Sequence, residues 1–115
     1  MATPESAAHP AHKQALRETG LDGTVVTEVF TGRHARMLRS PIVERLESSG
    51  RAPLPFPVQG GLTRPITAAA LERGDRSNVF LLAGQGAGAV RELPAGALLA
   101  ALVAETDEAL VRVAH

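Results

Sequence analysis

The residues that most suggest chemistry lie between Val79 and Val90, in the stretch "VFLLAGQGAGAV". Here a short apolar run leads into Gly84, Gly86 and Ala89, which have the G-x-G-x-x-G/A spacing of a dinucleotide-binding turn. Glycines in such a turn allow the backbone to approach a pyrophosphate closely. The spacing alone therefore raises the hypothesis of a nucleotide site.

The surrounding sequence argues against that hypothesis. A dinucleotide fingerprint needs a full helix after the glycines, and a second parallel strand with an acidic residue about 20 residues further on. Pro94 limits any helix after Gly88 to roughly one turn. We instead interpret the small residues as a close-packing segment, and expect Gly86 and Gly88 to let two backbones approach each other.

Two further groups of residues carry chemical potential. His9 and His12 have the spacing of one helical face, but no third metal ligand lies nearby in the sequence, so we expect both to be solvated. Around His34, arginines recur at every third position and could form a basic stripe, for which a solvated face is the favoured interpretation: Arg33, Arg36 and Arg39. The sequence shows no paired acids, Ser-His-Asp set or P-loop, so these residues alone assign no reaction.

Length and composition limit the class of protein. The chain has 115 residues, no Trp or Tyr and three Phe, so it forms at most one small domain with a modest core. Twelve basic and twelve acidic residues give no net charge, which argues against nucleic-acid binding. Cysteine is absent, which excludes disulfides and thiolate chemistry. No signal peptide or membrane-spanning run is visible, and we therefore expect a cytoplasmic chain.

Helices separated by loops dominate the expected secondary structure. Helices are predicted from Pro10 to Gly20, from Pro41 to Ser48, from Leu62 to Gly74 with Pro65 near its start, and from Pro94 to Ala114. The apolar residues of the last helix fall on one face: Leu98, Leu99, Leu102, Val103, Leu110 and Val113. The β-branched segment "TVVTEVF", residues 24–30, is the one convincing strand, and the proline-rich residues 51–61 are expected to form an extended loop.

The order of these segments resembles a known family. "ATPESAAHPAHKQAL", "TVVTEVFTGRHARMLRS", "PLPFPVQGGLTRPITAAALERGD" and "LLAGQGAGAVRELPAGALLAALVAE" follow one another as in the C-terminal third of nitronate monooxygenases, formerly called 2-nitropropane dioxygenases. Each block is weak by itself, and the ordered set covers essentially all 115 residues. The resemblance implies an α/β protein, the C-terminal part of an FMN-binding (β/α)8 TIM barrel. As an isolated chain it is expected to be mostly α-helical with one short strand.

The resemblance also implies a division of the chain. Residues 1–20 correspond to the end of the last barrel strand and the following helix, residues 21–60 to the strand and proline-rich loop, and residues 61–115 to the C-terminal helices. In the family the phosphate-binding turns and the catalytic histidine precede the segment that resembles Met1, so no catalytic residue is assigned here. The weak candidates for cofactor binding are Gly84, Gln85 and Gly86. The chain is thus expected to be a truncated or split gene product that does not bind FMN alone.

The activity implied by the resemblance is oxidation of alkyl nitronates with dioxygen, with the missing N-terminal barrel portion as a partner. Two alternatives stay open. The first is another flavin reductase of the same barrel group, acting on quinones with NADH or on enoyl-carrier-protein substrates. The second is a small helical interaction protein without catalysis, which uses Leu98, Leu102 and Val113 as a partner face.

Overall fold

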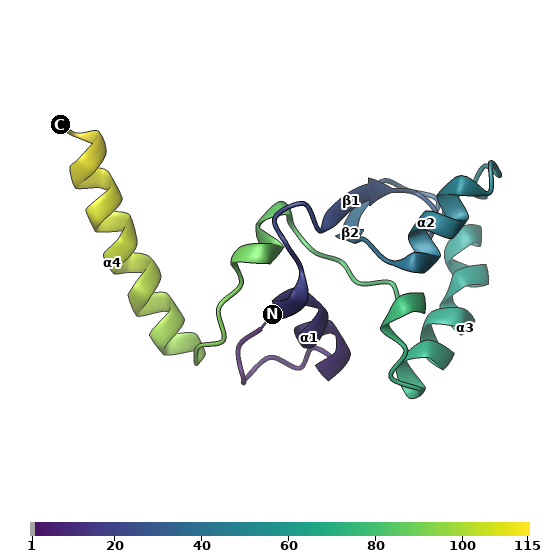
Figure 1. The fold of residues 1–115 in the computed structure, drawn as a ribbon, viewed down its shortest axis with the longest axis horizontal. Coiled ribbons are helices and arrows are strands. Elements are labelled where there is room, and N and C mark those ends of the chain that lie inside the picture. The colour runs from purple at the N-terminus through teal and green to yellow at the C-terminus, as the bar shows by residue number, and fades with distance from the viewer. Residues whose placement is uncertain (1) are drawn as a thin grey trace. The chain divides into compact units, whose positions relative to one another are not determined.

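The computed structural model describes residues 2–115, which form two compact units (Figure 1). Residues 9–90 make up the larger one, called the 9–90 unit below. Residues 2–8 and 91–115 make up the smaller one, called the terminal unit. The terminal unit is not continuous in sequence, because residues 2–8 belong with the last helix.

The sheet of the 9–90 unit is antiparallel. Strand β1 (Thr24–Thr27) pairs with β2 (Ala35–Leu38), with Thr24 opposite Leu38. On its other side β2 bonds to residues 81–83, since the Leu38 N–H donates to the Leu81 carbonyl at 2.9 Å and the Ala83 N–H donates to the Arg36 carbonyl at 3.3 Å. The prediction of one strand over residues 24–30 is therefore wrong in two respects: the strand ends at Thr27, and it has a partner.

Burial on both faces explains why β2 escaped sequence reasoning. Met37 is buried in one hydrophobic cluster, with Phe30 and Val43, whereas its neighbour Leu38 is buried in another, with Leu16. Successive side chains of a strand point to opposite faces, so a strand covered on both sides loses the alternation that predicts a strand. The two clusters thus lie on opposite sides of β2.

Two helices of the 9–90 unit begin and end close to their predicted limits. Helix α1 (Pro10–Glu18) has Pro10 in its first turn, and α2 (Pro41–Ser48) begins with Pro41. Both starts use proline where its missing N–H leaves no helical bond unmade. A short 3-10 helix, η1 (Arg76–Asn78), lies near α1, α2 and a third helix, α3 (Val58–Glu72).

Helix α3 (Val58–Glu72) is longer than predicted and contains Pro65 in its interior. Its first turn occupies residues 58–61, where the end of the extended loop is expected from the sequence. Side chains of the first two turns bond to carbonyl groups of another segment: the Gln59 amide donates to Val29 at 2.6 Å, and the Thr63 hydroxyl donates to Phe30 at 2.6 Å. These tertiary bonds fix the helix start, and they override the local preference of a proline to begin a helix.

The terminal unit is built on α4 (Ala95–Val113), as predicted. Pro94 is the N-cap residue, and the Glu5 carboxylate accepts the Ala95 N–H at 3.1 and 3.2 Å. Arg91 forms a two-bond ion pair with Glu105, at 2.5 and 3.2 Å. A carboxylate at the first turn and a paired charge along the helix both stabilise it. Among residues 2–115, each helix is too short or too polar to cross a bilayer.

Candidate functional site

The candidate cofactor-binding residues form one exposed turn. Gly84 is the N-cap residue of a short 3-10 helix, η2 (Gln85–Ala89), and its carbonyl accepts the Ala87 N–H at 3.1 Å. Gly84, Gln85 and Gly86, called the 84–86 turn below, are all exposed. Among residues 2–115, apart from the neighbouring backbone of the turn itself, no heavy atom lies within 4 Å of the position that a Cβ would take on either glycine. The backbone of the turn is therefore open to a ligand that approaches from outside.

Buried neighbours hold the 84–86 turn in place. Ala83 and Ala87 belong to the hydrophobic cluster that includes Leu16 of α1. A Cβ on Gly88 would lie 2.9 Å from the carbonyl carbon and oxygen of Gly20. The expected close packing is thus confirmed at Gly88 and wrong at Gly86, because η2 turns Gly86 outward while Gly88 faces the chain after α1.

The β-structure that precedes these glycines in the sequence differs from that of a dinucleotide-binding fold. Residues 81–83 pair with an antiparallel strand, and the following helical segment is η2, a 3-10 helix of five residues. A pyrophosphate-binding turn joins a parallel strand to a full α-helix whose N–H groups point at the phosphate. The G-x-G-x-x-A spacing therefore has a different structural setting here.

The two N-terminal histidines have structural roles. His9 caps α1, where its Nδ1 accepts the Ala11 N–H at 3.2 Å. His12 places Nε2 2.9 Å from the Leu82 carbonyl and so ties α1 to the segment before the 84–86 turn. His9 is exposed, as expected, whereas His12 is partly buried. Within residues 2–115 no cluster of metal-ligating side chains is found.

The three arginines do not form a helical stripe, because they lie before, within and after β2. The Arg33 guanidinium lies over the Phe56 ring, 4.1 Å from its centre. Arg36 donates to the Thr24 hydroxyl at 3.1 Å, and Arg39 donates to the Asp22 carbonyl at 3.2 Å. Each guanidinium therefore has its own neighbour in the 9–90 unit.

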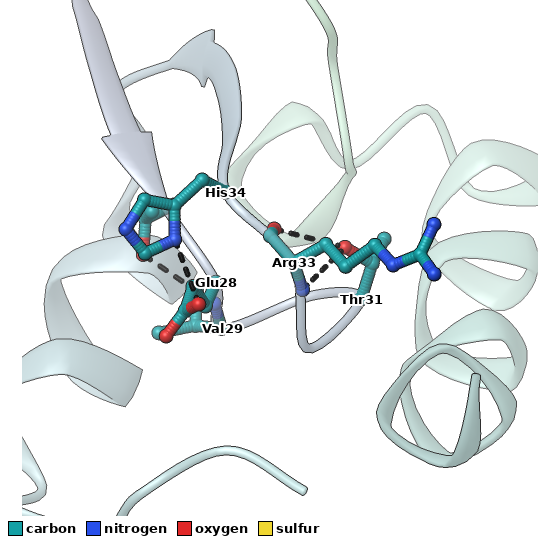
Figure 2. A network of polar contacts seen from close by, with 6 residues as sticks. Glu28, Val29, Thr31, Arg33 and His34 are labelled. Carbon is teal, nitrogen blue, oxygen red and sulfur yellow. Dashed lines mark hydrogen bonds and ion pairs between the residues drawn. The ribbon is translucent and has the colours of Figure 1, made fainter. Parts of the chain in front are cut away.

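A polar network that sequence reasoning missed occupies the turn between β1 and β2 (Figure 2). His34 Nδ1 lies 2.7 Å from a carboxylate oxygen of Glu28, and the Thr31 hydroxyl bonds both to the N–H and to the carbonyl of Arg33. The Arg33 side chain extends away from His34 (Figure 2), so the guanidinium and the imidazole do not converge on one ligand. The available signal was Gly32, since a glycine between two polar residues indicates a tight turn.

The backbone of this turn contacts residues 54–56 and accepts hydrogen bonds from the start of α3. Gly32 has a φ of +78°, and a Cβ there would lie 2.7 Å from the backbone nitrogen of Phe56. Gln59 and Thr63 bond to the carbonyls of Val29 and Phe30. These contacts hold the turn against residues 54–63, and they leave the ring of His34 largely exposed.

Carboxyl groups with shifted pKa values lie elsewhere. A hydrogen bond from Arg76 lowers the pKa of Glu18, one from Asn78 lowers that of Asp75, and one from Arg91 lowers that of Glu105. All three shifts favour the ionised form at neutral pH. These groups act as anionic partners of neighbouring side chains, which is the opposite of what a general acid requires.

Comparison with known proteins gives a consistent result. The family model described as "Nitronate monooxygenase" matches residues 1–105. A nitronate monooxygenase of Pseudomonas aeruginosa is 39% identical over 103 residues, which is 89% of this chain and 29% of that protein. The crystal structure of a nitroalkane oxidase from Streptomyces ansochromogenes superposes with a TM-score of 0.86 at 41% identity, over 97% of this chain and 32% of the other.

A second solved structure, FabK from Thermotoga maritima, matches with a TM-score of 0.75 at 25% identity, over 97% of this chain and 36% of that one. The chain thus spans about a third of the length of these relatives. The expected fold, the C-terminal part of a (β/α)8 TIM barrel, is confirmed by these matches. Among the described residues it is mostly helical, with a two-stranded sheet in place of the single strand expected.

Proposed function

The chain belongs to the nitronate monooxygenase family, and on that premise we propose that it is the C-terminal part of an FMN-dependent enzyme that oxidises alkyl nitronates with dioxygen. The observation that carries this proposal is the match over nearly the whole chain, both to the family model and to a nitroalkane oxidase structure. The residues of this chain alone assign no reaction, so the proposed substrate class is taken from the relatives.

The part of this chain that would contact the flavin is the 84–86 turn. Two glycines without neighbours at their Cβ positions leave an open backbone edge that a planar ring system can approach. Ala83 and Ala87 hold that edge rigidly from the buried side. FMN, when bound, supplies the electron chemistry of the reaction, and the role of Gly84, Gln85 and Gly86 is to position it.

Catalysis requires residues outside this chain. We assign residues 1–20 to the end of the last barrel strand and the following helix, residues 21–60 to the hairpin and proline-rich region, and residues 61–115 to the C-terminal helices. In (β/α)8 barrels the site is assembled from loops that follow several strands. The chain alone is therefore proposed to be inactive, with an N-terminal barrel portion as its partner and the cytoplasm as its location.

The first experiment measures flavin binding by the 115-residue chain. FMN is anchored mainly through its phosphate, and rigid-body association costs at least about 4 kcal/mol before any contact counts. The 84–86 turn has no aromatic side chain to stack on the ring. We expect a colourless protein with a Kd for FMN no better than about millimolar. A yellow preparation with one flavin per chain would overturn the assignment of the main flavin contacts to the missing portion.

The second experiment tests the reaction itself. A hybrid joins the N-terminal part of the Pseudomonas aeruginosa relative to this chain, replacing the matching C-terminal part of that relative. We expect the hybrid to bind FMN and to oxidise an alkyl nitronate with consumption of dioxygen. Reduction of a quinone by NADH, without nitronate turnover, would favour the alternative reductase activity.

The non-catalytic alternative has one observation in its favour, the exposed apolar side chains of α4. A helical interaction protein should be folded and monodisperse by itself. Analytical ultracentrifugation of the chain distinguishes the two cases. A single folded monomer, together with a hybrid that binds no flavin, would favour the interaction protein.

A further inference from the structure

Strand β1 forms one edge of the sheet in the 9–90 unit. In an antiparallel pair only every second residue bonds to the neighbouring strand, and the residues between them direct their N–H and carbonyl groups outward. The Arg39 N–H donates to the Gly23 carbonyl at 2.8 Å, so in this register the odd-numbered residues of β1 bond to β2. The backbone groups of Thr24 and Val26 therefore point away from β2.

The hydrogen bonds on the other side of β2 support this alternation. Leu38 and Arg36 stand opposite Thr24 and Val26, and their backbone groups bond to residues 81 and 83 instead of β1. Among residues 2–115, no other backbone group bonds to the N–H or carbonyl of Thr24 or Val26. Two donors and two acceptors along the outer edge of β1 are thus available to another strand.

The side chains of β1 do not block this edge. Its sequence, TVVT, consists of β-branched residues, which favour strands. Edge strands that stay unpaired usually carry a charged residue, a proline or a bulge, and β1 has none of these. Val26 is 45% exposed, so an apolar side chain accompanies the outward backbone groups. A second strand would cover both.

The outer edge of β1 is complementary to a second copy of itself. When two β1 strands lie antiparallel about Val25, Thr24 of one comes opposite Val26 of the partner subunit. Both residues direct their backbone groups outward, so the two such pairs can each exchange both of their hydrogen bonds. The two Val25 side chains then form a cross-strand pair between them. Just beyond the strands, Asp22 comes opposite Glu28 of the partner subunit, and their like charges end the ladder there.

We propose that this chain associates with a second copy through β1, with the two strands antiparallel about Val25. A two-fold axis uses the same edge of both copies, so the association closes at a dimer and does not continue into a fibre. The sheet then runs without interruption from one copy into the other. The surface is separate from the 84–86 turn and does not depend on the proposed flavin contacts.

The test measures association and amide exchange in the 115-residue chain. Sedimentation velocity over a series of concentrations gives the monomer–dimer equilibrium, and hydrogen exchange followed by NMR gives the protection of each amide. We expect the amides of Thr24 and Val26 to exchange about tenfold more slowly when about 90% of the chain is dimeric, because only the monomer leaves them open. The amides of Val25 and Thr27 already lie within the ladder, so their protection should change little.

The variant Val26→Pro isolates the backbone contribution. It removes an N–H that points away from β2, so the bonds between β1 and β2 can stay intact. Dimerisation should weaken about tenfold or more, because both copies lose a donor at the contact. The matched control is Val26→Thr, which keeps the N–H and the branched side chain and should dimerise like the unchanged protein. If Val26→Pro does not fold, Val26→Lys places a charge at the same edge and should also weaken the dimer.

A second control separates β1 from the exposed apolar side of α4. Leu99→Ala should leave dimerisation unchanged, since Leu99 lies outside the 9–90 unit. A dimer that Leu99→Ala weakens and Val26→Pro does not would overturn the proposal, because α4 would then be the contact. A chain that stays monomeric at every concentration would also overturn it, as would a dimer in which the amides of Thr24 and Val26 exchange as fast as in the monomer.

The hybrid provides the last comparison. If the 115-residue chain gives no dispersed spectrum, the same measurements on the hybrid decide. A dimeric hybrid with slow exchange at Thr24 and Val26 would support pairing between copies. A monomeric hybrid in which these amides are protected would assign the edge to the N-terminal portion of the enzyme and overturn the proposal.

Discussion

The 9–90 unit and α4 differ in how far their large apolar side chains are buried. In the 9–90 unit the largest side chains are enclosed: Phe30, Met37 and Val43 are each about 1% exposed. In α4 no residue is buried, and Leu99 and Leu110 are 64% and 63% exposed. The 9–90 unit therefore supplies its own core, whereas α4 presents an apolar side that the other described residues of the terminal unit do not cover.

The start of α4 is nevertheless fixed by several interactions. Pro94 begins the helix, the Glu5 carboxylate accepts the first N–H, and Arg91 pairs with Glu105. Pro94 and a carboxylate from the opposite end of the chain define where α4 begins, whereas burial of its apolar side needs a second surface. The following predictions test how far the two regions differ.

The largest expected effect is loss of a core aromatic side chain. Phe30 packs in the cluster with Met37, and its ring centre lies 5.1 Å from that of Phe80. Phe30→Ala should lower the free energy of unfolding by about 3–5 kcal/mol, because it removes buried area and leaves a cavity. Urea unfolding of the 115-residue chain, monitored by circular dichroism, measures the change.

The matched substitution in the other region is Leu99→Ala. Its side chain is exposed in the described chain, so the change in unfolding free energy should stay below about 0.5 kcal/mol. In the hybrid the same substitution should cost about 2 kcal/mol or more if the barrel portion covers α4. Equal costs for Phe30→Ala and Leu99→Ala in the chain alone would mean that α4 is already covered there.

The next largest effect is expected at Gly32. Its φ of +78° lies in the left-handed region, and its missing Cβ makes room for the backbone of residues 54–56. Gly32→Ala should cost about 2–4 kcal/mol, since backbone strain and overpacking add together. Gly50 is the control, because it has a φ of +67° but nothing within 4 Å of the Cβ position, and Gly50→Ala should cost only about 1 kcal/mol. Similar costs for both would contradict the close packing at Gly32.

Local signals in the sequence accounted for most of the helices. Proline at the first turn predicted α1 and α2, and the one-sided apolar spacing predicted α4. The ordered blocks also indicated the family and the barrel class, which the comparisons confirm. These features depend on residues close together in the chain, or on segment order, and both can be read without a structure.

Features that depend on distant contacts could not be predicted. β2 lost its alternation because Met37 and Leu38 are buried on opposite faces. The start of α3 depends on bonds from Gln59 and Thr63 to residues 29 and 30. At the candidate site, the spacing of the glycines gave no indication that Gly86 is open while Gly88 packs against Gly20. The assignment of Gly84, Gln85 and Gly86 to the flavin remains a prediction.

Smaller effects on the free energy of unfolding should distinguish Gly86 from Gly88, the two glycines of η2. Gly88→Ala places a methyl group 2.9 Å from the Gly20 carbonyl and should destabilise the chain by about 1–3 kcal/mol. Gly86→Ala meets open space and should leave the free energy of unfolding nearly unchanged. In the hybrid, the Gly86 variant should weaken FMN binding without loss of stability. If Gly86→Ala destabilised the chain as much as Gly88→Ala, the turn would pack differently from its position here.

The smallest effect concerns one exposed ion pair in each region. A hydrogen bond from Arg76 lowers the pKa of Glu18 in the 9–90 unit, and one from Arg91 lowers the pKa of Glu105 in the terminal unit, both from an ordinary value of 4.5. Because the folded-state pKa values are lowered, each pair contributes its stability fully above the ordinary value and loses it as the pH falls through the folded pKa. Both carboxylates are exposed, so the contribution is small and is screened by salt.

Carboxyl chemical shifts followed from pH 7 to pH 2 should show that Arg76→Gln raises the pKa of Glu18 alone and that Arg91→Gln raises that of Glu105 alone. A shift of both carboxyl groups in either variant would show that the two regions are electrostatically coupled, and the contrast between them would then be one of burial only.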